Sequence, residues 1–214
     1  PATVAEAEQL LWCGSDINAK DFHGRTVLSY AAREGRHDVV DLLLQAKADV
    51  EGVTRDGYCS LHIASQFGQA AVVEVLLANK ANVEATSPDN SRSLHIAAQF
   101  GQADVVEKLL AHGADIEAKT HDGIVALCVA SLFGQPEVIK MLLLHKAELE
   151  AATPDGFRAL HLAARTGHDK VVRTLFAARA VVDARDKFGR TPLDLAKDYD
   201  HVEVIDLFEG AGSL

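Results

Sequence analysis

The chain has 214 residues, of which 48% are hydrophobic and 24% are charged, and its formal net charge is −10. This composition is that of an ordinary folded protein and argues against intrinsic disorder. The acidic excess repels phosphate groups, so we expect neither nucleic acid nor an anionic membrane as a partner.

Residues 1–20 match only the second half of the unit that repeats after them. Their apolar positions (Val4, Leu10, Leu11 and Trp12) fit a second helix. We expect either a half-repeat cap or the remainder of a longer array. The segment also lacks the basic flank and apolar block of a secretion signal, and no apolar run of the chain can span a bilayer.

From Asp21 onward the sequence repeats every 33 residues without insertion or deletion. The recurring positions are Leu28, Leu61, Leu94, Leu127, Leu160 and Leu193; Ala31, Ala64, Ala97, Ala130, Ala163 and Ala196; Gly24, Gly57, Gly123, Gly156 and Gly189; and Gly35, Gly68, Gly101, Gly134 and Gly167. Asn90 and Asp200 each replace one glycine. The period predicts repeats over residues 21–53, 54–86, 87–119, 120–152 and 153–185, followed by 186–214, all within one domain.

Each unit predicts two short helices. A glycine turn opens the second unit, and a helix over residues 61–65 ends at Gly68. A second helix over residues 71–77 has a one-sided apolar stripe, and residues 80–84 lead into the next turn. Because one unit cannot bury its own apolar face, the units must stack into an elongated solenoid.

The last unit differs from the others on its outer face. It carries many charged residues and stops without another hairpin: Asp194, Lys197, Asp198, Asp200, Glu203, Asp206 and Glu209. Terminal repeats need a polar outer surface, so residues 186–214 are expected to be a capping repeat.

The run DFHGRTVLSYAAREG from Asp21 and the run AHGADIEA from Ala111 closely resemble the ankyrin repeat. The resemblance covers residues 21–214. It implies an all-α, ankyrin-type solenoid of helix–turn–helix units with short hairpin loops. It also implies an adaptor or scaffold that binds another protein, of unspecified identity, and not an enzyme.

The chain departs from the family pattern at two places in the repeat. The Thr-Pro-Leu-His turn of the family never keeps both Thr and His here, so the hydroxyl–imidazole link of that turn is unavailable. Where the family prefers glycine after the second helix, this chain has Lys47, Lys80, Lys146 and Arg179. In a left-handed conformation each would cost on the order of 1 kcal/mol, which predicts moderate stability.

Histidine and cysteine are the candidates for chemistry. His62, His95 and His161 share one repeat position, where a structural role is favoured over a metal site or a general base. Cys59 and Cys128 fall at similar first-helix positions and are expected to be core thiols. With Cys13 the chain has three cysteines, an odd number, and none of them shows CxxC spacing. This favours free thiols in the cytoplasm or another reducing intracellular compartment. No phosphate loop, zinc motif or nucleophile elbow is found, so we expect no catalytic residues, cofactor, metal or small-molecule substrate.

The hairpins carry acidic residues that recur with the repeat. They are interpreted as a solvated edge: Asp49, Glu51, Glu84, Asp115, Glu117, Glu148, Glu150 and Asp183.

The resemblance places the partner on the hairpin tips and on the exposed side of the first helices. The late first-helix candidates are Arg33, Gln66, Phe67, Gln99, Phe100, Leu132, Phe133, Arg165 and Tyr199, and the tip candidates are Phe22, Tyr58, Ile124, Phe157 and Phe188. Phe67, Phe100 and Phe133 would form an aromatic ladder along a concave groove, a composition typical of a binding hot spot. Alternatively, these rings pack between adjacent helices and stabilise the fold.

Two further interpretations remain open. The outward positions of the second helices are mostly charged, which favours one binding face, but a structural or linker subunit that contacts several proteins is the alternative function. Together with Leu10, the residues Asp16, Ile17 and Asn18 resemble the hairpin in which asparaginyl hydroxylases modify ankyrin repeats, so Asn18 is a candidate modification site.

Overall fold

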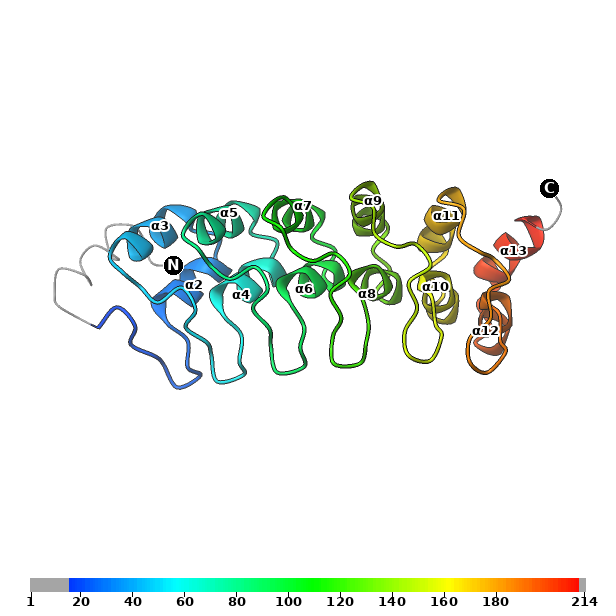
Figure 1. Ribbon diagram of the computed structural model, residues 1–214, viewed down its shortest axis with the longest axis horizontal. Coiled ribbons are helices and arrows are strands. Elements are labelled where there is room, and N and C mark those ends of the chain that lie inside the picture. Colours follow the sequence, from blue (N-terminus) through cyan, green and yellow to red (C-terminus); the bar gives the residue numbers. More distant parts are fainter. Residues whose placement is uncertain (1–15, 212–214) are drawn as a thin grey trace.

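A computed structural model describes residues 16–211, in which twelve helices form two parallel layers above a row of hairpins (Figure 1). The first helices are α2 (Val27–Arg33), α4 (Ser60–Gln66), α6 (Ser93–Gln99), α8 (Ala126–Leu132), α10 (Ala159–Thr166) and α12 (Pro192–Asp198). The second helices are α3 (His37–Gln45), α5 (Ala70–Ala78), α7 (Ala103–Ala111), α9 (Pro136–Leu144), α11 (Asp169–Ala177) and α13 (Val202–Ala211). The expected all-α solenoid of helix–turn–helix units is confirmed.

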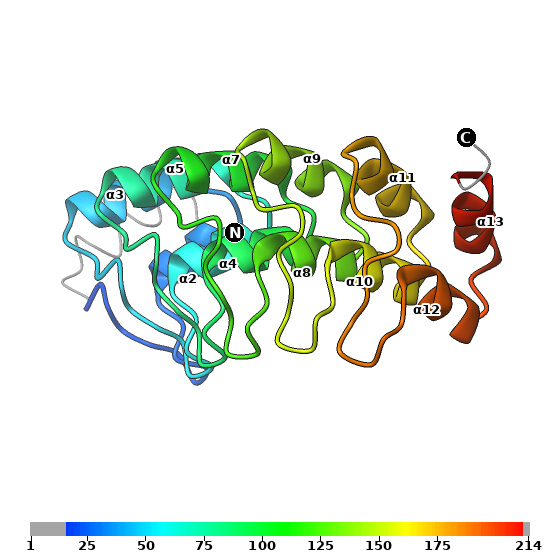
Figure 2. The same cartoon turned by 45° about the vertical axis from the view of Figure 1, so that its right-hand side comes forward.

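The units stack in sequence order. Each first helix contacts the next first helix, and each second helix contacts the next second helix, from α2 and α3 to α12 and α13. The rotated view in Figure 2 shows the same two layers along the whole length. The repeated leucines of the first five units, such as Leu61 and Leu94, are almost completely buried, and Leu193 of the last unit is partly buried. Burial of each such side chain contributes roughly 1.5–3 kcal/mol to folding.

The helix ends follow the predicted turn chemistry. Helix α4 ends at Gln66, and Gly68 follows in the left-handed region with φ +71°. A Cβ at Gly68 would overlap Oε1 of Gln102, whose amide donates a hydrogen bond to the carbonyl of Gln66. The left-handed backbone therefore favours glycine there, and a Cβ would in addition displace the flexible Gln102 amide from its hydrogen bond.

The non-glycine residues at turn positions adopt the conformation that the sequence predicts. Lys47, Lys80, Lys146 and Arg179 all have φ between 65° and 68°, and Asn90 has φ 59°. The expectation of left-handed residues at these positions is confirmed, and with it the reason for a stability cost.

The repeat-position histidines have a structural role, as expected. His62, His95 and His161 are buried, and Nδ1 of each accepts the backbone N–H of the residue that precedes its helix. Cys59 and Cys128 are also buried, which confirms the core thiols. Their positions are not equivalent, however. Cys59 precedes helix α4, whereas Cys128 stands inside helix α8 where other repeats have histidine.

The interpretation of the hairpin acids as a solvated edge is incomplete for four of them, which also make hydrogen bonds at that edge. Oε1 of Glu51, Glu84, Glu117 and Glu150 each accepts a backbone N–H from the following hairpin, 31 residues further along, at 2.7–2.9 Å. A stack places equivalent hairpins side by side, so a side chain can bind the backbone of its neighbour. These carboxylates therefore link successive units.

The predicted partial repeat falls mainly outside the described part of the chain. Val4, Leu10, Leu11, Trp12 and Cys13 lie outside the residues that the structure describes.

Candidate functional site

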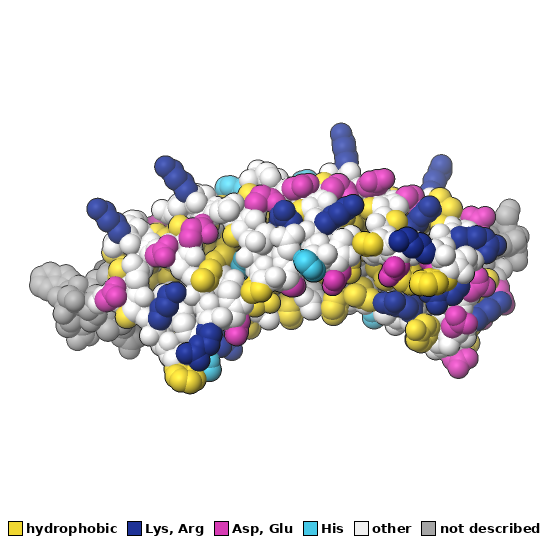
Figure 3. Space-filling view, turned by 60° about the horizontal axis from the view of Figure 1, so that its bottom comes forward, with side chains coloured by type: hydrophobic (Ala, Val, Ile, Leu, Met, Phe, Trp, Pro, Cys, Tyr) yellow, Lys and Arg dark blue, Asp and Glu magenta, His cyan; other side chains and the backbone are white. Residues whose placement is uncertain are grey.

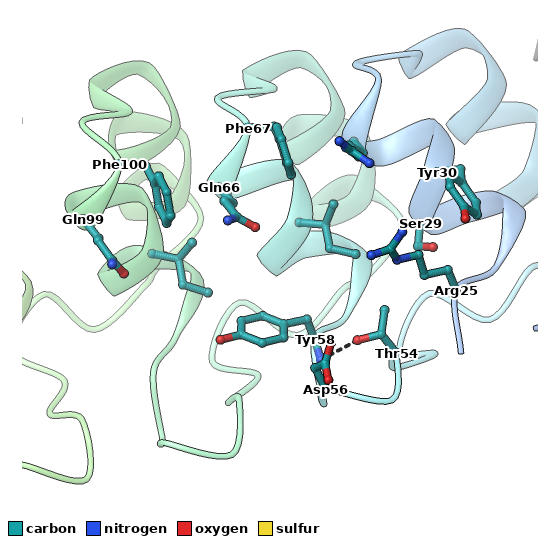
Figure 4. A pocket seen from close by; sticks show the side chains of 13 residues that line it. Arg25, Ser29, Tyr30, Thr54, Asp56, Tyr58, Gln66, Phe67, Gln99 and Phe100 are labelled. Atoms are coloured by element: carbon teal, nitrogen blue, oxygen red, sulfur yellow. Dashed lines mark hydrogen bonds between the residues drawn. The ribbon is translucent and has the colours of Figure 1, made fainter. Parts of the chain in front are cut away.

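A groove runs along the exposed side of the first helices, between them and the hairpins. Its best-formed section lies over α2, α4 and α6 and has a volume of about 480 Å³ (Figure 4). It is lined by Arg25, Ser29, Tyr30, Arg33, Thr54, Asp56, Tyr58, Ile63, Gln66, Phe67, Ile96, Gln99 and Phe100. Arg25, Arg33 and Asp56 are the charged residues of this lining, so most of the groove is formed by apolar, hydroxyl and amide side chains.

Six of the residues predicted to contact a partner come together in this section. They are Arg33, Tyr58, Gln66, Phe67, Gln99 and Phe100. The sequence interpretation missed Ile63 and Ile96, which stand four residues before Phe67 and Phe100. Residues at that spacing share one face of a helix, so this signal was available. It missed Arg25, Ser29, Tyr30, Thr54 and Asp56 as well; of these, Arg25 shares its repeat position with Tyr58.

The three equivalent phenylalanines are partly exposed. Phe67, Phe100 and Phe133 directly follow helices α4, α6 and α8, and their exposed fractions are 43%, 45% and 45%. Somewhat more than half of each residue is therefore buried, and the rest is open to the outside.

The other predicted residues lie further along the same row. Ile124, Leu132 and Phe157 are partly buried and pack against the core, so they offer less surface than Phe133. Phe22, Phe188 and Tyr199 are strongly exposed toward the two ends. None of these residues, nor Phe133 and Arg165, lines the section over α2, α4 and α6.

Arginine side chains stack on aromatic rings at both ends of the row. The guanidinium carbon of Arg33 lies 5.0 Å from the ring centroid of Phe67, and that of Arg165 lies 5.2 Å from the centroid of Phe157. Such cation–π contacts hold the guanidinium group over the ring and leave its N–H groups available to other acceptors.

The space-filling view in Figure 3 shows how side chains are distributed on the hairpin side. The outline is hollowed along its lower edge, where hydrophobic side chains gather in the middle and Lys and Arg side chains lie toward both ends. The surface of this acidic protein is therefore uneven in charge, and its concave edge is less acidic than its composition suggests.

Asn18 is partly buried and takes part in the link between hairpins. Its Oδ1 accepts the backbone N–H of Asp49 at 2.8 Å, at the same repeat position as the Glu51 carboxylate. Hydroxylation of Asn18 stays a prediction.

A second, shallower notch lies on the opposite face, between the second helices α9 and α11. Leu144 is 75% exposed there, and the notch is lined by Lys140, Leu143, Leu144, Arg173, Thr174, Ala177 and Ala178. The sequence interpretation missed this notch because the positions equivalent to Leu144 in other repeats hold Ala, Gln or Gly.

The thiol and imidazole groups that could support other chemistry are buried. Burial raises the pKa of the Cys128 thiol to about 12 and lowers the pKa of His62. Within residues 16–211, no three His, Cys, Asp or Glu side chains are grouped closely enough to hold a metal ion. None of the helices in that range combines the length and the apolar character that crossing a membrane requires.

Comparison with known proteins agrees with this architecture. The sequence profile of ankyrin repeats (three copies) matches residues 4–89, 94–186 and 127–211, which together span nearly the whole chain. An ankyrin repeat protein of fowlpox virus (strain NVSL) is 50% identical over 50 residues, which is 23% of this chain and 8% of the viral protein. The matched part is thus a small fraction of that relative. With two stacked helices and a hairpin in each 33-residue unit, the chain belongs to the ankyrin repeat family.

Proposed function

We propose that the chain is a non-catalytic adaptor or scaffold that holds a partner protein against its concave groove and hairpin tips. The observation that carries this proposal is the row of Phe67, Phe100 and Phe133, each 43–45% exposed at equivalent positions. Ankyrin repeats in general are protein-interaction modules, and this row is the part of the chain most suited to that role.

The physical argument concerns exposed aromatic surface. Soluble proteins rarely expose a continuous apolar strip unless it is covered when they function. Partly exposed aromatic rings beside amide side chains, here Gln66 and Gln99, are typical of the energetic centre of a protein interface. The buried part of each residue restricts the movement of its ring, so less side-chain entropy is lost on binding.

The test separates binding from folding by alanine replacement. Phe67→Ala, Phe100→Ala and Phe133→Ala should each reduce capture of a partner from native extract at least tenfold, with little change in thermal melting. Phe176→Ala is the matched control, because Phe176 packs edge-to-face on Phe208 at 5.0 Å between α11 and α13. We expect it to lower the melting temperature and to leave capture by the folded fraction unchanged.

The opposite result would reject the proposal. If the three groove variants melt as early as the Phe176 variant, and their folded fractions still capture the partner at full strength, then the rings serve packing and not recognition.

The notch around Leu144 supports a second candidate function. A structural or linker subunit needs two separate binding faces, and Leu144 offers an exposed apolar side chain on the face away from the groove. If Leu144→Asp releases one protein and Phe100→Ala releases a different one, the chain joins two partners. If Leu144→Asp releases nothing, the groove alone accounts for the interactions.

A reducing intracellular compartment is part of the same proposal. Cys59 and Cys128 are free thiols, and both are buried. Because neither forms a disulfide within the described chain, the fold does not depend on an oxidising environment.

A further inference from the structure

We infer that the groove is built for an extended peptide segment that carries a carboxylate near each end and none in the middle. This inference rests on the proposed function, because it specifies the partner of the same groove. The observations behind it are the positions, contacts and pairing of the charged residues along the row.

Arg33 and Arg165 occupy the same repeat position, four units apart. The residues at that position in the three units between them are uncharged: Gln66, Gln99 and Leu132. Arg25, which also lines the groove over α2, adds a second positive charge beside Arg33. The first-helix side of the groove therefore has a neutral floor with a positive charge at each end.

These two arginines are available to an incoming carboxylate. Arg165 has no ion pair within the described part of the chain, and Arg33 has only a 4.0 Å contact with Glu34 between two exposed side chains. An exposed pair at that distance contributes little. Other arginines near the hairpins are already neutralised, since Arg158 pairs with Glu150 at 2.7 Å and Arg190 pairs with Asp186 at 2.9 Å.

The acidic hairpin tips disfavour a negatively charged partner residue in the middle of the groove. Four successive units carry an exposed aspartate at the same tip position: Asp56, Asp89, Asp122 and Asp155. A partner carboxylate over the units of Asp89, Asp122 and Asp155 would face this acidic row, whereas at Asp56 the exposed Arg55 stands next to it and stacks on Phe22. Like charges at close range are unfavourable, so the row selects against acidic residues there.

The spacing sets the length of the segment. Four steps between neighbouring first helices, at about 8–10 Å each, separate Arg33 from Arg165 by roughly 30–40 Å. An extended chain advances about 3.3–3.6 Å per residue, so the two carboxylates should stand roughly 9–12 residues apart. Between them, apolar or aromatic side chains would lie against Phe67, Phe100 and Phe133.

The experiment selects 16-residue peptides from a random displayed library on the whole chain. We expect Asp or Glu to be enriched at two positions roughly 9–12 residues apart, with acidic residues depleted between them. A synthetic peptide of the selected sequence is then titrated by fluorescence anisotropy. Its affinity should fall at least tenfold for the double variant Arg33→Gln, Arg165→Gln, and the loss should shrink at high salt.

Two controls make the result specific. The double variant Lys170→Gln, Arg173→Gln removes the same charge from helix α11 and should change the affinity less than twofold. Replacing the two peptide carboxylates by amides should abolish the difference between wild type and the Arg33→Gln, Arg165→Gln variant, because the lost interaction is then absent from both.

Two outcomes overturn the inference in distinguishable ways. If selected peptides lose binding with Phe67→Ala but show no paired acidic positions and do not respond to Arg33→Gln, Arg165→Gln, the groove binds proteins by another chemistry. If no peptide is enriched, or binding is insensitive to Phe67→Ala, both this inference and the proposed use of the groove are wrong.

Discussion

Nε2 of His62 donates a hydrogen bond to the carbonyl oxygen of Ala85, which lies 2.9 Å away in the hairpin that leads to the next unit. His95 makes the same contact with Ala118 at 2.9 Å. Because Nδ1 of each ring accepts a backbone N–H at the start of its own helix, the neutral ring with its proton on Nε2 satisfies both partners. The imidazole thus ties a helix start to the following hairpin.

This arrangement predicts a stability that falls in mild acid. Burial lowers the pKa of His62, His95 and His161 below the ordinary value of 6.5. The unfolded chain binds protons at a higher pH than the folded chain does, so the full stability is present above about pH 6.5 and is lost progressively below it. The urea midpoint should fall between pH 7.5 and pH 5.

The carboxyl groups whose pKa is lowered in the folded chain contribute to the pH dependence mainly below this range. Hydrogen bonds from Thr191 lower the pKa of Asp194, so its contribution is lost only below the ordinary aspartate value of about 3.8. A urea midpoint that stays constant from pH 7.5 to pH 5 would contradict the histidine argument.

Cys128 occupies the imidazole position of its repeat and makes a weak version of the same link. Its Sγ lies 3.6 Å from the carbonyl oxygen of Ala151. Cys128→His should restore the stronger hydrogen bond and raise the free energy of unfolding at pH 8 by about 0.5–1.5 kcal/mol. Urea denaturation measures this, and a lower stability at pH 8 would mean that the site cannot hold an imidazole.

The lysines with a left-handed backbone conformation predict sites at which replacement by glycine stabilises the protein. Lys80 has φ 67°, and Gly113 occupies the same position in the next unit with φ 84°. Lys80→Gly should stabilise the protein by about 1 kcal/mol, since glycine tolerates this conformation.

The reverse substitution is the matched control. A Cβ at Gly113 would have no atom within 4 Å, so Gly113→Lys should destabilise through the backbone conformation alone, by a similar amount. Equal stability of all three proteins in thermal and urea melts would show that the conformation carries no cost here.

The carboxylate links between hairpins can be tested at Glu117. Its Oε1 accepts the backbone N–H of Glu148 at 2.7 Å. Glu117→Ala removes this acceptor and should lower the free energy of unfolding by about 1 kcal/mol, whereas Glu117→Gln keeps an amide oxygen and should lose less. The two variants would be indistinguishable in urea melts if the side chain were merely solvated.

The buried thiol predicts slow chemical labelling. Burial raises the pKa of Cys128 to about 12, so almost no thiolate exists at pH 8 in the folded protein. Iodoacetamide should modify Cys128 only as fast as the protein unfolds, as followed by peptide mass spectrometry with and without urea. Rapid labelling of the folded protein would show that the site is open.

The sequence could predict those features of the fold that repeat at 33-residue intervals. Leu61 and Leu94 repeat because every unit buries the same position, and Gly68 recurs because every first helix ends in the same left-handed turn. It could also predict that Phe67 and Phe100 lie near one another. It could not predict Arg25 in the groove, because its repeat position holds residues as different as Tyr58 and Ile124 in other units. Asp56 does recur at its position, but the repeat alone does not say which tip residues face the groove.

By itself, therefore, the sequence determined the unit, its period and the family, because a local pattern copied six times reports on each helix and turn separately. Only the tertiary structure decided what neighbouring units do to one another. Glu117 reaches the backbone 31 residues away, Arg33 covers the ring of Phe67, and Leu144 is left uncovered. These relationships depend on how far each unit is displaced and rotated against the next, which no single unit encodes.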